Sequence, residues 1–175
     1  MSTHKLPAIV LALGLGSGAA FAAGPNLGTP IEPGEIAPWD ISIQPDGTGL
    51  PMGGGTPAQG ARIFAQKCAL CHGENGKGGP FAALVGGAPL ASGIDTPKTI
   101  ANFWGYSTTV FDFIRRAMPW QQPRSLTDNE VYALTAYILA ENKLIGENDS
   151  MNPETLPKVR MPNRDGFIIR FPDKI

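Results

Sequence analysis

The chain has 175 residues, which is enough for one domain of ordinary size, and 42% of them are hydrophobic. Its formal net charge of −1 excludes the strongly basic surface by which proteins bind nucleic acid. The 22 glycines and 17 prolines are well above average usage, and only 17% of the residues are charged. This composition predicts a chain with long loops that gains stability from a large bound group.

Residues 1–23 are predicted to be a secretory signal peptide. Lys5 gives a short positive start, and an apolar stretch interrupted by glycines follows from Leu6 to Phe21. The small residues on either side of Phe21 place cleavage after Ala22 or Ala23. An uncleaved anchor would need about 20 strongly apolar residues, which this stretch does not provide. The mature chain is therefore expected in the periplasm, without a membrane span.

Residues 24–56 are predicted to form an irregular arm rich in proline and glycine. Its one strand-like patch is Trp39–Ile43, and the stretch Pro45–Gly55 holds five glycines and two prolines. Two interpretations stay open, a flexible linker or an ordered arm lying on the domain or on a partner. A buried aromatic anchor such as Trp39 favours the second.

A helix is predicted from Pro57 to Lys67, because Thr56 is a good N-cap and proline suits the first helical position. Gly60 within it leaves room for the close approach of another element. The glycines between Gly73 and Gly93 predict a loop.

Two further helices are expected. Ser107 can cap a helix that runs to Ala117, before Pro119 ends it. The residues from Thr127 to Glu130 form a capping box that begins a helix ending near Asn142. Its apolar residues at three- and four-residue spacing are Val131, Leu134, Tyr137 and Ile138.

The run Cys68-Ala69-Leu70-Cys71-His72 has the C-x-x-C-H pattern of c-type haem attachment. Two thiols three positions apart reach the two vinyl groups on one porphyrin edge, and the adjacent imidazole then binds the iron. The alternatives are a thioredoxin-like pair, half of a zinc site or a disulfide. A zinc site needs more ligands than the mature chain offers. A thioredoxin-like pair requires a strand before the motif, and a disulfide would leave the role of His72 unexplained.

The second axial ligand follows by elimination. The other histidine, His4, lies in the predicted signal peptide, so methionine is the remaining soft ligand. Met118 follows a helix and precedes a proline that stiffens the loop presenting its sulfur. Ligation by His72 and Met118 raises the haem potential, which suits electron transfer and disfavours oxygen or peroxide chemistry. The other candidates lie in segments rich in proline and glycine, and they are Met52, Met151 and Met161.

A further pattern consists of Gly60 and Phe64 before the motif and of Leu134 and Tyr137 on the last helix. Through these residues the segment 57–143 resembles the class I cytochromes c. This resemblance implies an all-α fold in which the first and last helices cross beside one covalently bound haem. We expect a cytochrome domain at residues 57–145 and an extended tail at 146–175, which with the first arm would bury little apolar surface alone.

A second resemblance spans most of the mature chain. The segments that carry it are Trp39–Ile41, Pro45–Pro51, Asn102–Thr109, Phe111–Pro119 and Leu156–Phe167. They resemble the cytochrome c subunit of periplasmic sulfite and sulfane dehydrogenases of the sulfur-oxidising (Sox-type) system. In that family a molybdenum-cofactor subunit performs the oxidation, and the cytochrome accepts the electrons without being catalytic itself. With its single C-x-x-C-H motif this chain would be the mono-haem form.

The resemblance also implies roles around the haem. Pro80 matches the proline whose carbonyl accepts the N–H of the proximal imidazole, although an ordinary loop proline explains it equally well. Trp104, Tyr106 and either Arg115 or Arg116 are candidates to hydrogen-bond the haem propionates, the alternative being surface packing.

Two functions are therefore weighed. The first is an electron-transfer subunit of a molybdenum-dependent sulfur-compound dehydrogenase, which passes electrons to a soluble cytochrome or a terminal oxidase. The second is a free-standing, diffusible cytochrome of a respiratory chain. A haem enzyme or gas sensor would require an open or labile iron position, which the predicted ligation does not leave.

Overall fold

The structure, a computed structural model, describes residues 28–90 and 95–167. The predicted signal peptide, residues 1–23, lies outside these described residues. The chain divides into two units, of which the first ends at Trp39 and the second begins at Asp40.

The described part of the first unit contains one short helix, α1 (Pro33–Ile36), which begins with a capping box between Glu32 and Glu35. Trp39 is 79% exposed, and an ordered arm that lies on the domain or on a partner stays a prediction. The patch Trp39–Ile43 forms no strand.

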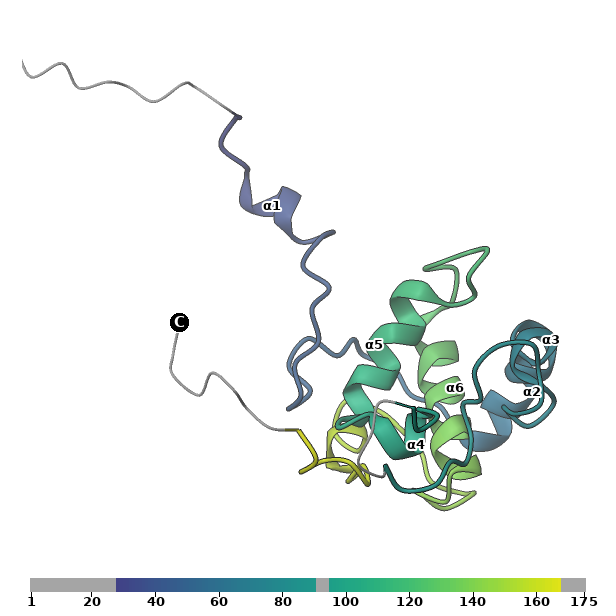
Figure 1. The fold of residues 1–175 in the computed structure, drawn as a ribbon. Coiled ribbons are helices and arrows are strands. Elements are labelled where there is room, and N and C mark those ends of the chain that lie inside the picture. Colours follow the sequence, from purple (N-terminus) through teal and green to yellow (C-terminus); the bar gives the residue numbers. More distant parts are fainter. Residues whose placement is uncertain (1–27, 91–94, 168–175) are drawn as a thin grey trace, which may run out of the picture. The chain divides into compact units, whose positions relative to one another are not determined.

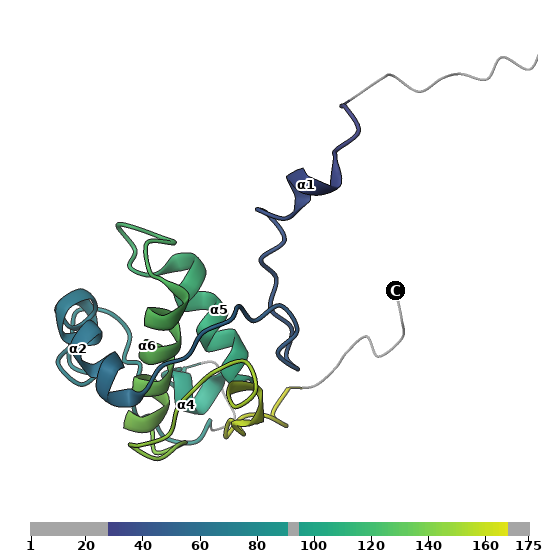
Figure 2. The ribbon, with the colours of Figure 1, turned by 180° about the vertical axis from the view of Figure 1, so that it is seen from behind.

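Three longer helices build the second unit, as the sequence predicts. They are α2 (Pro57–Lys67), α5 (Ser107–Ala117) and α6 (Asp128–Glu141). Figure 1 and Figure 2 both show α6 between α2 and α5, and α6 contacts both. Every residue of α6 from Val131 to Ala140 is buried, which is the pattern of a helix surrounded by other elements.

Capping fixes where two of these helices begin. The Thr127 hydroxyl accepts the N–H of Glu130 at 3.3 Å, and the Glu130 carboxylate accepts the N–H of Thr127 at 2.8 Å. Thr56 and Gln59 form the same pair at the start of α2. Helix α5 differs from expectation, because its N-cap is Tyr106. Ser107 is the first helical residue, and its hydroxyl instead donates to the Leu156 carbonyl at 2.6 Å.

The crossing of α2 and α6 is close because Gly60 has no side chain. A Cβ at that position would overlap the carbonyl oxygen of Ala133 and approach Tyr137 Cβ to 2.6 Å. Next to it the rings of Phe64 and Tyr137 pack with centroids 5.0 Å apart, and Leu134 is buried in the same core. A tilted aromatic pair contributes about 0.5–1.5 kcal/mol beyond its buried area. The expected class I helix crossing is therefore present.

Short helical turns complete the unit. These are α3 (Ala69–His72), α4 (Ile100–Phe103) and the 3₁₀ turn η1 (Leu156–Lys158). The only strand-like pairing among residues 28–90 and 95–167 is a bridge between Gly55 and Met151, so the all-α prediction is confirmed.

None of the helices in these ranges is long and apolar enough to cross a membrane.

The segment after α6 is more than an extended tail. Met151, Leu156 and Met161 are each at most 3% exposed, and all three belong to the same hydrophobic core as α2, α5 and α6. We had expected this segment to bury little apolar surface alone. Its irregular backbone instead brings an apolar side chain into the core at every fifth residue.

Candidate haem site

The C-x-x-C-H motif lies where α2 passes into α3. Cys68 ends α2 by donating its N–H to the Phe64 carbonyl at 2.9 Å, and it also precedes the first residue of α3. Its own carbonyl accepts the N–H groups of Cys71 at 3.1 Å and His72 at 3.0 Å. One helical turn thus holds both cysteines and the histidine, and Phe64 connects that turn to the core.

The two cysteines are free thiols in the structure. Burial raises the pKa of the Cys68 thiol to about 11, so before haem attachment it is the protonated thiol at neutral pH. The described residues contain no group of three or more His, Cys, Asp or Glu side chains able to hold a metal ion. A helix rather than a strand precedes the motif, which removes the thioredoxin-like alternative.

His72 is oriented by a backbone carbonyl, but not by the predicted one. Its Nδ1 lies 3.2 Å from the carbonyl oxygen of Ala82, and this contact requires Nδ1 to be the protonated nitrogen. Nε2 therefore keeps its lone pair for a metal. Pro80, to which the sequence gave this role, is exposed and makes no such bond, because the intervening turn brings the chain back to His72 two residues later. Sequence spacing gave no signal for Ala82.

The four methionines of the described chain lie in three different environments. Met52 is 88% exposed, whereas Met151 and Met161 are buried in the core at 3% and 1% exposure. Met118 alone is half-buried, at the C-cap of α5, where its N–H donates to Ile114 at 3.1 Å. Met118 is therefore fixed at a helix end and only partly buried against the core, which is compatible with a ligand to an inserted group.

The candidate propionate partners already have protein contacts. The Trp104 ring packs edge-on against Phe113 at 5.5 Å, and the Arg164 guanidinium lies 3.8 Å from the ring centre of Tyr106. Arg115 pairs with Asp128 at 3.3 Å. Arg116 donates to Asp112 and to the Ile41 carbonyl. Their predicted role at the propionates stays a prediction.

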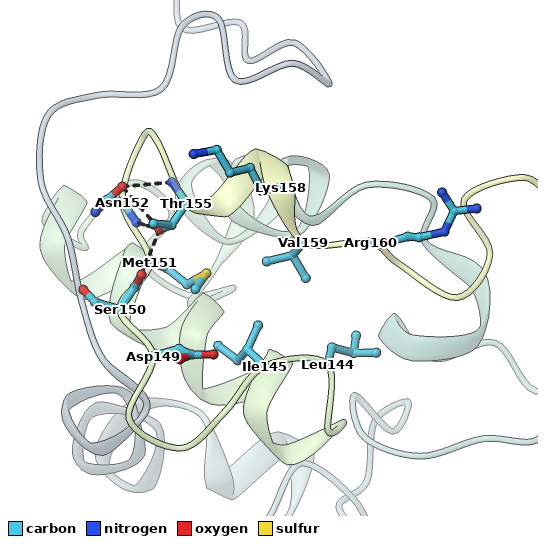
Figure 3. Close-up of a pocket in the computed structure, with 10 residues that line it drawn as sticks. All are labelled: Leu144, Ile145, Asp149, Ser150, Met151, Asn152, Thr155, Lys158, Val159 and Arg160. Atoms are coloured by element: carbon cyan, nitrogen blue, oxygen red, sulfur yellow. Dashed lines mark hydrogen bonds between the residues drawn. The ribbon is translucent and has the colours of Figure 1, made fainter.

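An open pocket lies in the segment that follows α6. Figure 3 shows its lining residues, with Asn152 and Thr155 hydrogen-bonded to each other. None of them belongs to the candidate haem site, and the pocket is therefore separate from it. They are Leu144, Ile145, Asp149, Ser150, Met151, Asn152, Thr155, Lys158, Val159 and Arg160.

The donor set fits haem c. Two free thiols and an imidazole with a free Nε2 lie on one turn, and a half-buried thioether is presented at a helix end. Together with the glycine-mediated crossing of α2 and α6, this set defines a c-type cytochrome.

Comparison with known proteins agrees. Residues 55–138 match the family model described as cytochrome C oxidase, cbb3-type, subunit III. The crystal structure of the sulfane dehydrogenase SoxCD from Paracoccus pantotrophus contains a similar chain, with 35% identity and a TM-score of 0.75. The likeness covers 85% of this chain and 72% of that one. The chain belongs to the class I c-type cytochromes, and it resembles the cytochrome subunit of the sulfite and sulfane dehydrogenases. Its cofactor is one haem c, attached covalently through Cys68 and Cys71.

Two curated relatives match over shorter spans. A thiosulfate dehydrogenase of Stutzerimonas stutzeri is 33% identical over 50% of this chain. The cbb3-type cytochrome c oxidase subunit FixP of Azorhizobium caulinodans is 38% identical over 49% of this chain. Each match covers 28% of the relative, so this chain corresponds to little more than a quarter of either protein.

Proposed function

We propose that this chain is the mono-haem, non-catalytic electron-transfer subunit of a periplasmic, molybdenum-dependent sulfite or sulfane dehydrogenase. The observation that carries the proposal is the extent of the likeness to a SoxCD chain. That likeness covers 85% of this chain, whereas the cytochrome family model matches residues 55–138 alone. If the likeness reflected haem binding alone, it would be limited to the haem domain.

His72 and Met118 are the proposed axial ligands. Haem c supplies one-electron chemistry between Fe(III) and Fe(II), and histidine–methionine ligation raises its potential. The Ala82 carbonyl keeps the proton of His72 on Nδ1 and so keeps Nε2 available for the iron. Met118, at the end of α5, would supply its thioether as the second ligand and would thereby keep water and other ligands from the iron.

The partners follow from the same proposal. A molybdenum-cofactor subunit would oxidise the sulfur compound by two electrons and deliver them singly to this chain. A soluble cytochrome or a terminal oxidase would receive them.

Reconstitution tests the proposal. The purified holocytochrome should be reduced by sulfite, or by a sulfane sulfur donor, in the presence of the molybdenum subunit and should stay oxidised without it. An unrelated mono-haem cytochrome c of similar potential is the control, and an artificial acceptor shows that the dehydrogenase is active. If the dehydrogenase reduces the artificial acceptor but neither sulfur compound reduces this cytochrome, the proposal is wrong.

The alternative of a diffusible carrier is favoured by the family match, which covers residues 55–138 and so little beyond the cytochrome domain. Size-exclusion chromatography of the native periplasmic fraction separates the two functions. The proposed subunit elutes with a molybdenum-containing partner, whereas a free carrier elutes as a monomer.

A further inference from the structure

The segment from Ala82 to Gly86 is held in place by two sets of hydrogen bonds. The first set is local, because Leu84 and Val85 both donate their N–H groups to the Gly76 carbonyl, at 2.7 and 3.2 Å. The second set comes from Asn142, which is the C-cap of α6. This segment is therefore connected to the helix that forms the centre of the core.

The Asn142 amide binds the residues on both sides of Val85. Its Nδ2 donates to the Leu84 carbonyl at 3.2 Å, and its Oδ1 accepts the N–H of Gly86 at 2.8 Å. The second Nδ2 proton goes to the Ile138 carbonyl at 2.9 Å. Val85 itself is 6% exposed. The Asn142 side chain thus pairs with the backbone of Leu84 and Gly86 as a neighbouring strand would. The last turn of α6 fixes its position.

The held segment contains the group that orients His72. Leu84 is two residues after Ala82, whose carbonyl lies 3.2 Å from His72 Nδ1. Helix α6 also packs on α2, which leads directly into Cys68. The same helix therefore supports the covalent attachment point through α2 and the carbonyl beside His72 through Asn142.

We propose that Asn142 is a positioning residue that holds the Ala82 carbonyl against the His72 imidazole and thereby adjusts the haem potential. The inference rests on the proposed ligation by His72. A carbonyl that accepts the Nδ1 proton makes the imidazole a stronger donor to iron, which favours the ferric state. A displaced carbonyl weakens that donation, so the potential rises.

The competing explanation is that Asn142 only caps α6. Its bond to Ile138 would serve that purpose, and its loss would then lower stability without changing the ligand. Potential and proton exchange distinguish the two roles, because neither depends on the stability of a helix end.

The test is Asn142→Leu in the holoprotein, which removes all three hydrogen bonds at similar volume. We expect a tenfold shift of the one-electron equilibrium toward the ferrous state, which corresponds to a rise of about 59 mV. We also expect faster solvent exchange of the His72 Nδ1 proton, measured by NMR of the ferrous protein. Asn142→Gln keeps the amide but displaces it by one methylene, and it should shift both quantities less, in the same direction.

Asn102 offers a matched control. Its Nδ2 also donates to two carbonyls, of Ala88 and Pro97, and its Oδ1 accepts one N–H, of Thr99. It does not bond Leu84 or Gly86 itself and reaches the held segment only through Thr99, whose hydroxyl donates to the Gly86 carbonyl at 2.5 Å. Asn102→Leu should therefore reduce stability with a smaller change in potential than Asn142→Leu. The inference is overturned if Asn142→Leu leaves the potential and the exchange rate at wild-type values, or if Asn102→Leu shifts them equally.

Failure of the ligation proposal has a different signature. In that case the ferric wild-type protein would lack a strongly shifted His72 ring resonance, before any variant is made. A shifted His72 resonance together with unaltered Asn142 variants would overturn the positioning role alone.

Discussion

Met118 is the residue whose sulfur completes the proposed ligand pair. Replacing it by alanine removes the thioether, so the weak absorption band near the red end of the spectrum, which reports methionine–iron coordination, should disappear. Met52→Ala is the control, because the Met52 side chain is 88% exposed and the band should survive its loss. A band that persists in Met118→Ala and is lost in Met52→Ala would reassign the ligand to Met52.

Glu130 links the start of α6 to the end of α2. The side-chain hydrogen bond from Lys67, at 2.7 Å, lowers the pKa of Glu130 below its ordinary value of 4.5, and the Thr127 backbone adds to the effect. A lowered folded-state pKa means that the stabilisation is present above pH 4.5 and is lost as the pH falls through the folded pKa. Both side chains are partly exposed, at 38% and 27%, so solvent weakens the pair.

Lys67→Met should therefore reduce stability at pH 7 by about 0.2–1 kcal/mol. The reduction should shrink as the pH falls below 4.5 and through the lowered pKa of Glu130, because the carboxyl then becomes protonated in the wild type as well. Urea unfolding of the holoprotein at pH 7 and at a series of acid pH values measures it. Lys77→Met, on an exposed loop residue, is the control. A loss that stays constant over the whole series would show that the pair contributes through packing and not through charge.

Gly60 determines how closely α2 and α6 approach each other. In Gly60→Ala the new Cβ would overlap the Ala133 carbonyl, so the two helices must move apart. Overpacking of this kind costs about 1–3 kcal/mol. We expect a lower midpoint of chemical unfolding and a lower yield of protein with attached haem. Gly34→Ala, at a helical glycine with no atom within 4 Å of its added Cβ, should change neither quantity.

The longer helices were predictable because their signals are local. Capping residues, Pro57 and the spacing of apolar residues fix α2 and α6 within the chain itself. Helix α4 was not predicted, although Thr99 and Asn102 form a capping box there, because asparagine replaces the usual glutamate or glutamine and the helix has one turn. Ser107 was assigned as a cap because its actual partner, Leu156, is 49 residues away.

The residues that attach the haem were predictable from the sequence, whereas the carbonyl that orients His72 was not. Cys68, Cys71 and His72 form a contiguous pattern whose chemistry depends on spacing alone. The carbonyl that orients His72 depends on how a loop rich in glycine returns to the motif, and Gly73, Gly76 and Gly78 all have positive φ there. Backbone turns of this kind leave no side-chain signature. For that reason the sequence indicated Pro80 where the structure has Ala82.

On the scale of the whole second unit, the segment after α6 belongs to the core. It contributes Met151, Leu156 and Met161, and its 3₁₀ turn η1 contacts α5. Further on, Asn163 donates to the Phe103 carbonyl at 2.6 Å, and Arg164 covers the ring of Tyr106. This segment therefore fixes the start of α5, the helix whose other end presents Met118.

Leu156→Ala tests that dependence. The side chain is fully buried, so its truncation should cost about 2–5 kcal/mol and leave a cavity beside η1 and α5. Because the Leu156 carbonyl also accepts the Ser107 hydroxyl, the start of α5 should loosen, and Met118 should bind less firmly. The measurements are urea unfolding and displacement of the methionine ligand by added imidazole. Lys158→Ala, an exposed residue of the same turn, should leave both unchanged. A Leu156→Ala protein with wild-type stability would mean that the segment only covers the core and does not hold it together.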